Sequence, residues 1–188
     1  IDRGRRGAMA NSRSGRGAKA GSGSDARRVT VEEPGRTPPL GVILGYGAVL
    51  PLVVGAVVAW LSGGIVGALA VNLSILWGAA LLVFLAGVRR GVSFRTPAGP
   101  TRAQIGAMLW LFLTGFGAML SVAVPVTPVH VGPHVLSFSL LLAGFASLMV
   151  LDPWAAERVE APAFFRRLRP KQMAIATVAV AALLLRML

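Results

Sequence analysis

The sequence contains no cysteine, and only 14% of its 188 residues are charged. The lack of thiols excludes disulfides, zinc–thiolate centres and iron–sulfur clusters, and it gives no indication of the redox compartment. Soluble globular proteins carry roughly 25% charged residues, whereas 55% of this chain is hydrophobic. This balance is wrong for a water-soluble fold.

The few charges are segregated along the chain. Lysines and arginines crowd residues 1–36, 89–102 and 158–171, with long uncharged runs between these zones. A formal net charge of +12 would suit nucleic-acid binding, but no aromatic residue lies among the N-terminal arginines and no nucleic-acid-binding module follows. We therefore predict anionic membrane head groups as partners, and no nucleic acid.

Residues 1–39 are rich in Gly, Ser, Arg, Ala and Pro, which predicts a disordered basic tail on the cytoplasmic side. The chain starts at Ile1, and MANSRSGRG from Met9 resembles an alternative start, in which case the first eight residues are not native. An Arg- and Ser-rich, acid-poor beginning also fits an organelle transit peptide. Both interpretations exclude the tail from the fold.

Residues 40–188 contain five apolar stretches, at about 40–61, 65–88, 103–124, 135–151 and 173–188. A bilayer core about 30 Å thick needs roughly 20 helical residues, so the first three stretches are long enough and the last two are short. None alternates polar with apolar residues as a barrel strand does, and helices satisfy the backbone in lipid. We predict an all-α integral membrane protein with five transmembrane helices, the first kinked at Pro51.

The connections between these stretches predict the orientation. The tail holds nine Lys or Arg residues, the segment 89–102 holds four and the segment 152–172 holds five, whereas 62–64 and 125–134 hold none. Positive residues concentrate on the inner side of membrane proteins, so the N-terminus is predicted inside and the C-terminus outside. Arg186 is the exception on the outer side.

Four arginines follow the second stretch: Arg89, Arg90, Arg95 and Arg102. They are interpreted mainly as a stop-transfer and topology signal. The alternative is contact with lipid phosphates or with carboxylates of a partner, which a guanidinium binds through two donors.

The segment APAFFRRLRP suggests a short amphipathic element lying on the membrane interface, in contact with lipid or a docked protein. Its candidate contact residues are Phe164, Phe165, Arg166, Arg167 and Arg169. The nearby carboxylates Asp152, Glu157 and Glu160 are interpreted as solvated loop charges.

Two histidines, His130 and His134, are weak candidates for a metal or haem ligand. Pro128, Gly132 and Pro133 make a helix there unfavourable, and no carboxylate or thiol lies close in sequence, so an exposed outer loop is the main interpretation. Catalytic motifs such as GxSxG, HExxH and a phosphate-binding glycine loop are missing. We predict neither a cofactor nor an enzyme activity.

Small polar residues within the stretches are expected to bond between helices or to their own backbone rather than to line a permeation path. They are Asn72, Ser74, Thr114, Ser121, Ser137, Ser139 and Ser147. Three glycine pairs with a spacing of four residues predict close helix packing, within the chain or against a partner. They are Gly41 and Gly45, Gly63 and Gly67, and Gly87 and Gly91.

Four segments together resemble a family of bacterial and mitochondrial membrane proteins, catalogued as domain of unknown function 3429, which includes the transmembrane protein 69 type. They are ILGYGAVLPL, WGAALLVFLAGVRRG, GFASLMVLDPW and APAFFRRLRP. Val83, Ala86 and Arg90 depart from the residues usual in that family. The resemblance implies five helices and an inner-membrane location, and it implies no activity.

These observations predict a non-catalytic accessory or assembly subunit of a larger inner-membrane complex, with respiratory and photosynthetic complexes as candidates. Other membrane subunits are then the expected partners, in the bacterial plasma membrane or, alternatively, the mitochondrial inner membrane. A small transporter or channel for a neutral or lipid-like solute is the second hypothesis. A membrane enzyme or haem protein that uses His130 and His134 is a weaker third one.

Overall fold

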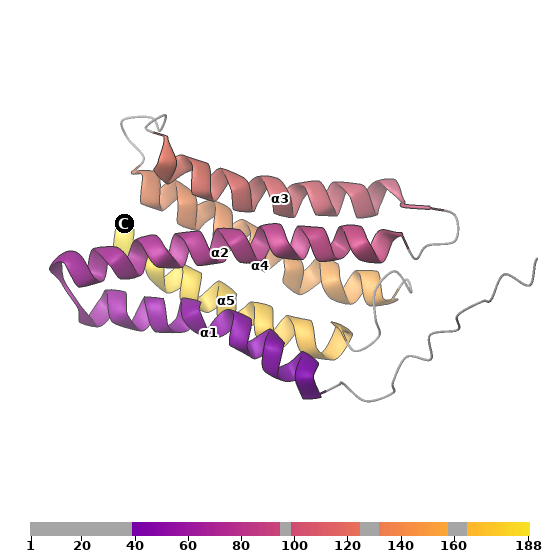
Figure 1. Ribbon diagram of the computed structural model, residues 1–188, viewed down its shortest axis with the longest axis horizontal. Coiled ribbons are helices and arrows are strands. Elements are labelled where there is room, and N and C mark those ends of the chain that lie inside the picture. Colours follow the sequence, from indigo (N-terminus) through magenta and orange to yellow (C-terminus); the bar gives the residue numbers. More distant parts are fainter. Residues whose placement is uncertain (1–38, 95–98, 125–131, 158–164) are drawn as a thin grey trace, which may run out of the picture. The chain divides into compact units, whose positions relative to one another are not determined.

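The computed structural model describes residues 39–94, 99–124, 132–157 and 165–188. Regular structure within these ranges is helical throughout, in five elements (Figure 1). The bounds are α1 Pro39–Leu61, α2 Gly64–Ser93, α3 Arg102–Ala123, α4 Pro133–Glu157 and α5 Phe165–Met187. All five are long and apolar enough to cross a membrane. The predicted fold class is confirmed, and the chain is a multi-pass helical membrane protein.

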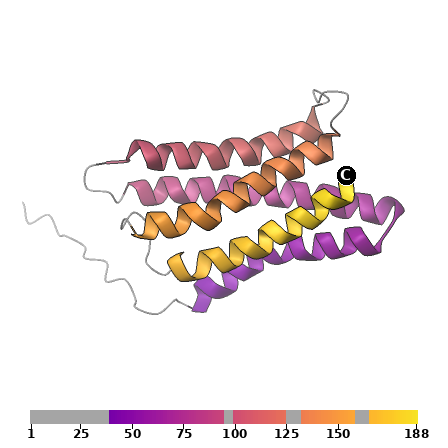
Figure 2. The same cartoon turned by 180° about the vertical axis from the view of Figure 1, so that it is seen from behind.

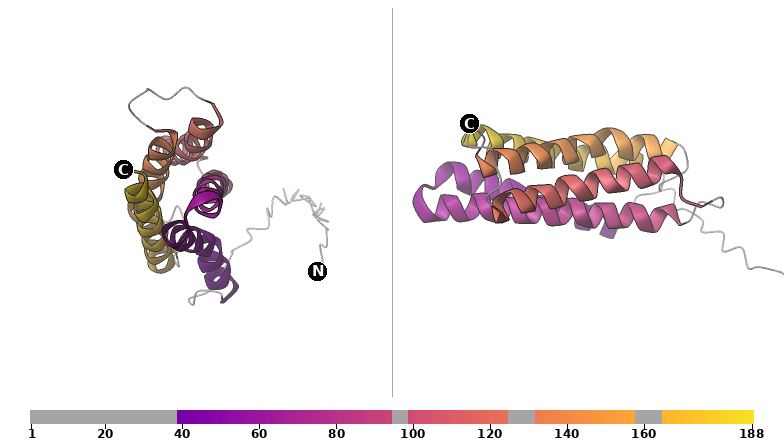
Figure 3. Two further views of the ribbon diagram at one scale, coloured as in Figure 1. Left: turned by 90° about the vertical axis from the view of Figure 1, so that its left-hand side faces the viewer. Right: turned by 90° about the horizontal axis from the view of Figure 1, so that it is seen from above.

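The helices follow one another around the bundle in chain order. Each contacts the next, α1 also packs against α5, and α2 touches α4 across the middle. Figure 2 shows α5 beside α1 from behind, and the end-on view of Figure 3 shows the same neighbours. The C-terminus lies at the end of the bundle that carries the α1–α2 turn (Figure 1). Arg186 Nη2 donates to Ser62 O in that turn at 3.4 Å.

α4 and α5 are longer than the sequence predicted. The expected helices 135–151 and 173–188 extend to Pro133–Glu157 and Phe165–Met187, with Pro153 and Pro170 inside them. A proline removes one backbone hydrogen bond, and here the two helices continue through it near their ends. The basic segment from Phe165 onward is therefore the start of α5 and not part of the connection before it, as the expected start at 173 implied. Contact of this segment with lipid or a docked protein stays a prediction.

The core between the helices is filled by large apolar side chains. Those with at most 1% of their surface exposed include Leu52, Ile75, Leu82, Leu111, Phe138, Leu141, Phe145, Leu148 and Leu183. Each helix contributes to this set, so all five share a single core. The outer surface is apolar as well, which suits helices surrounded by lipid.

Small residues set the closest approaches between helices. A Cβ built at Gly115 of α3 would lie 2.9 Å from Ala79 O of α2, and one at Gly144 of α4 would lie 3.0 Å from Thr114 Oγ1. Gly55 and Gly78 have similarly near neighbours on facing helices. None of these four belongs to the glycine pairs predicted from spacing.

Most of the buried polar side chains bond to nearby backbone, as expected. Ser74 Oγ donates to Ala70 O at 2.7 Å and Thr114 Oγ1 donates to Trp110 O at 2.9 Å. Other bonds join helices: Ser121 Oγ and Ser137 Oγ lie 2.6 Å apart, and Trp77 Nε1 donates to Ala48 O at 2.8 Å. This interpretation of the intramembrane polar residues is confirmed, and Ser139 is an exposed exception.

Replacing Gly115 by Ala tests the packing of α2 on α3. We expect the free energy of unfolding to fall by about 1–3 kcal/mol, because the methyl group overpacks against a backbone oxygen that cannot move freely. The matched control is Gly106→Ala, an exposed helical site with open space around it, where the better helix propensity of Ala favours the fold by up to about 1 kcal/mol. Unfolding in mixed micelles, followed by circular dichroism, measures both. Equal stability of the two variants would contradict the close approach.

The predicted orientation is tested with single cysteines, because the natural chain has none. Ser62→Cys lies in the α1–α2 turn and Pro100→Cys lies at the opposite end of the bundle, between α2 and α3. We expect a membrane-impermeant maleimide to label the first variant in intact cells and the second only after lysis. The reverse result would place the N-terminus outside.

Candidate functional site

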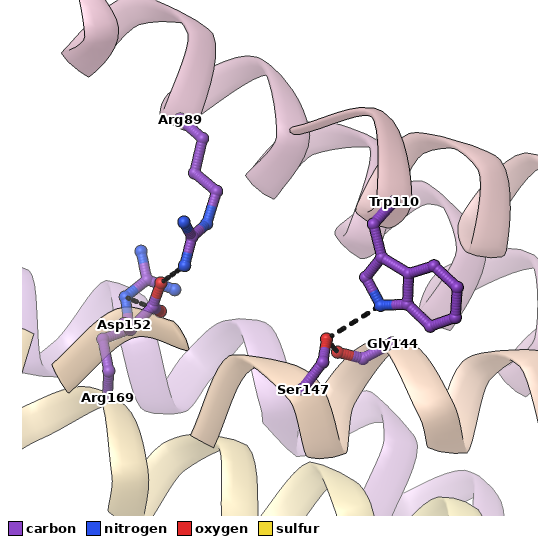
Figure 4. Close-up of polar contacts among 6 residues, drawn as sticks. All are labelled: Arg89, Trp110, Gly144, Ser147, Asp152 and Arg169. Atoms are coloured by element: carbon purple, nitrogen blue, oxygen red, sulfur yellow. Dashed lines mark hydrogen bonds and ion pairs between the residues drawn. The ribbon is translucent and has the colours of Figure 1, made fainter. Parts of the chain in front are cut away.

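Three charged side chains meet at the end of the bundle where α2 finishes and α5 begins. Arg89 of α2 donates through Nη2 to Asp152 Oδ1 of α4, and Arg169 Nε of α5 lies 3.8 Å from Asp152 Oδ2 (Figure 4). The exposed fractions of the Arg89, Asp152 and Arg169 side chains are 17%, 7% and 15%. We call these three residues the ion cluster.

Burial explains why the carboxylate has two cationic neighbours. An ionised carboxylate taken out of water costs several kcal/mol unless opposite charges and hydrogen bonds replace its solvation. Arg89 of α2 supplies a positive charge and a hydrogen bond, and Arg169 of α5 supplies a second positive charge. The interpretation of Asp152 as a solvated loop charge is wrong: the residue belongs to helix α4 and is 5% exposed.

A small cavity adjoins the ion cluster between α2, α3 and α4. Its volume is about 60 Å³, and Arg89, Ser93, Gln104, Asp152 and Trp154 provide its polar lining. A water molecule needs roughly 10–15 Å³ of such space and two to four polar partners, so the cavity has room for several. Arg89 Nε is buried without a hydrogen-bond partner among the described residues. The cavity is suited to ordered water molecules that hydrogen-bond to the ion cluster.

The two adjacent arginines point in different directions. Consecutive residues of a helix are about 100° apart, so Arg89 faces the bundle while Arg90 faces outward. The Arg90 guanidinium lies 4.5 Å from the centre of the Phe94 ring, a cation–π contact. Of these two arginines, Arg90 is the one placed to meet a lipid head group or a partner directly.

The six glycines of the predicted pairs fall into three cases. Side chains at Gly45 and Gly67 would collide with Gln172 and with Ser62 O, so these two pack within the chain. Gly41 and Gly63 have nothing within 4 Å of a built Cβ.

Gly87 and Gly91 form the third case. Both are exposed on α2 with nothing within 4 Å. Phe84 and Phe94, 66% and 64% exposed, flank them at helical spacing. We call Phe84, Gly87, Gly91 and Phe94 the α2 glycine face.

The histidine candidates are not brought into a metal site by the described residues. His134 is the second residue of α4, which begins at Pro133 despite the expectation of a loop, because proline suits the first helical position. Its Nε2 lies 3.4 Å from Asn72 Oδ1. The described ranges contain no group of three or more His, Cys, Asp or Glu that could hold a metal ion, and His130 lies outside them.

Several other predicted contact residues also lie outside the described part. Arg95 and Phe164 are in the undescribed segments, as is Glu160, which was interpreted as a solvated loop charge. The helix includes Phe165, Arg166 and Arg167, but their side chains are not described.

The pairing of Asp152 was missed although the sequence carried a signal for it. The buried face of α4 runs Phe138, Leu141, Phe145, Leu148, in steps of three and four residues. One further step of four reaches Asp152. The same spacing places Arg89 on the buried face of α2, after Leu82 and Leu85. Charged residues in register with a core stripe indicate an internal pair rather than a loop.

Comparisons with family models, curated proteins and solved structures find no match to this chain. The similarity to the family named above therefore stays a prediction.

Replacing Asp152 by Asn tests the ion cluster. Removing the charge leaves two partly buried guanidinium groups without their counter-charge, and we expect the free energy of unfolding to fall by about 3 kcal/mol, the lower end for a buried pair. Unfolding in mixed micelles measures the change. Arg90→Gln is the matched control at the neighbouring, outward-facing position, with an expected change within about 0.5 kcal/mol. If Asp152→Asn were as stable as Arg90→Gln, the cluster would not stabilise the fold.

Proposed function

We propose that this protein is a non-catalytic accessory or assembly subunit of a larger inner-membrane complex, and that a helix of another subunit packs on the α2 glycine face. The supporting observation is that Gly87 and Gly91 are surrounded by open space. Small residues four apart let two transmembrane helices approach closely, and nothing in the described part of the chain packs on this pair.

The contrast with other glycines strengthens the argument. Gly55, Gly78, Gly115 and Gly144 each have a helix-side neighbour inside 3.4 Å of a built Cβ, so the fold uses them itself. A helical glycine costs about 1 kcal/mol relative to alanine. At Gly87 and Gly91 no contact within the described chain offsets that cost, and a partner helix would.

Arg90 places a positive charge at the edge of this surface. It lies beside the α2 glycine face and is exposed, and its guanidinium stacks on Phe94. A charge at the rim of an interface guides partner choice more than it adds affinity. We expect the partner helix to carry a carboxylate, or to hold an anionic lipid, at this level.

The filled core weighs against the transporter hypothesis. Transport of a solute through the bundle needs a polar path at mid-membrane, with side chains free to bind the solute. Between the helices lie instead Leu82, Leu111, Leu141 and Phe145, all without measurable exposure. The polar groups at this depth, such as Thr114, are bonded to nearby backbone.

The test replaces each glycine of the α2 glycine face by Leu in the protein expressed at native level. We expect the natural chain to migrate within a larger complex in native-gel electrophoresis after mild extraction, and both Gly87→Leu and Gly91→Leu to migrate as the free subunit. The added side chains meet open space within the chain, so the fold should be retained.

Gly106→Leu is the matched control, because it is also a helical, exposed glycine with nothing within 4 Å. It should leave the complex intact. Migration of the natural chain as a monomer or as a homo-oligomer would refute the proposal. Loss of the complex in all three variants would show that the α2 glycine face has no special role.

A further inference from the structure

A shallow apolar groove runs along the outer surface between α1 and α5. Ala56 and Ala179 form its floor, at 7% and 6% exposure, and the exposed Val57, Ile175 and Val178 form its rims. The groove has a volume of about 420 Å³, and every residue that lines it is Ala, Val or Ile. It offers no polar group to an occupant along its length.

A cation lies beyond one end of this groove. Ala174, Val178 and Ala182 line it at steps of four residues, and the next step along the same face of α5 is Arg186. Trp60 marks this end, because its Nε1 donates to Ala182 O at 3.0 Å while its ring is 56% exposed. Tryptophan is enriched at this depth, where the hydrocarbon meets the head groups.

Arg186 has few partners at this position. Its hydrogen bond to Ser62 O is long, at 3.4 Å. The other lysines and arginines of the described helices lie at the opposite end of the bundle, at positions 89, 90, 102, 166, 167, 169 and 171. No carboxylate side chain in the described ranges pairs with it. Ser62 O is the one hydrogen-bond acceptor that Arg186 meets within the described ranges.

We propose that the α1–α5 groove binds a phospholipid, with one acyl chain along Ala56 and Ala179 and the phosphate on Arg186. A guanidinium binds phosphate through two parallel donors, and the apolar lining matches a hydrocarbon chain. The exposed ring of Trp60 packs beside the glycerol region. The lipid belongs to the leaflet on the side of the C-terminus.

The length of the groove favours an acyl chain over a partner helix. From Ala174 to Ala182 helix α5 rises about 12 Å. The hydrocarbon core is about 30 Å thick, so the groove covers close to the depth of a single leaflet. A transmembrane helix could pack over most of the hydrocarbon thickness of about 30 Å, which is more than twice the length of the groove.

Native mass spectrometry of the full chain tests this site, with phosphatidylglycerol as the probe and diacylglycerol as the same chains without phosphate. We expect the delipidated protein to retain a single phosphatidylglycerol and little diacylglycerol. Arg186→Gln keeps a donor for Ser62 O but loses the charge, and retention of phosphatidylglycerol should fall about tenfold, the effect of one charge-assisted hydrogen bond.

A second pair of variants tests the groove without changing any charge. Val178→Cys places a thiol on the groove rim and Leu113→Cys places one on the exposed surface of α3, at 69% and 60% exposure. A bulky maleimide on the first should abolish lipid retention, and the same reagent on the second should not. The chain contains no other cysteine, so each label is unique.

Three results would overturn the proposal. The first is equal retention of phosphatidylglycerol by Arg186→Gln and the natural chain. The second is equal retention of diacylglycerol and phosphatidylglycerol. The third is a disulfide-linked dimer formed by Val178→Cys in native membranes, which would make the groove an interface between two copies of this chain.

Discussion

The carboxylate of Asp152 fixes the arrangement of one end of the bundle. It is nearly fully buried, and its two cationic neighbours come from α2 and α5. A buried charge tolerates little displacement of its partners, because separation leaves each ion without solvation. The Arg89–Asp152 ion pair therefore fixes how α2 and α4 are positioned relative to each other along the bundle axis. Apolar packing, which is less directional, then completes the contacts of α3 and α4.

The same region shows how two consecutive helix positions can have different roles. Arg89 and Arg90 are neighbours in sequence, yet one belongs to the ion cluster and the other is exposed beside Phe94. The positive-inside rule concerns both equally, since it counts charges near a membrane surface. They differ only in the side of the helix from which each side chain projects. A positively charged pair at a helix end can thus contribute to topology, to internal stability and to recognition together.

Much of the fold was predictable because membrane helices must satisfy their backbone internally and span a fixed thickness. These constraints gave five helices and nearly correct bounds for α1 and α3, whereas α2, expected to end at 88, continues to Ser93. The bounds of α4 and α5 were too short because Asp152, Pro153 and Pro170 resemble loop residues when taken singly. Whether a charge is solvated depends on residues distant in sequence, such as Arg89 for Asp152, and spacing along one helix does not reveal its partner.

The glycines illustrate the same limit in the opposite direction. Spacing selected Gly87 and Gly91, which meet nothing, and overlooked Gly115 and Gly144, which lie against facing helices. A spacing of four residues shows only that two glycines share a face. Which face is filled by the chain itself depends on how the five helices are ordered around the core, and this order became known only with the structure.

The two surfaces for which we propose occupants lie on different helices. The α2 glycine face is near the C-terminal end of α2, beside the ion cluster, whereas the α1–α5 groove leads towards Arg186 and the α1–α2 turn. A helix packed on the first would not cover the second, because α1 and α5 form the latter alone. The two proposals, a partner helix on the α2 glycine face and a phospholipid in the α1–α5 groove, are therefore independent, and each is tested by substitutions that leave the other surface unchanged.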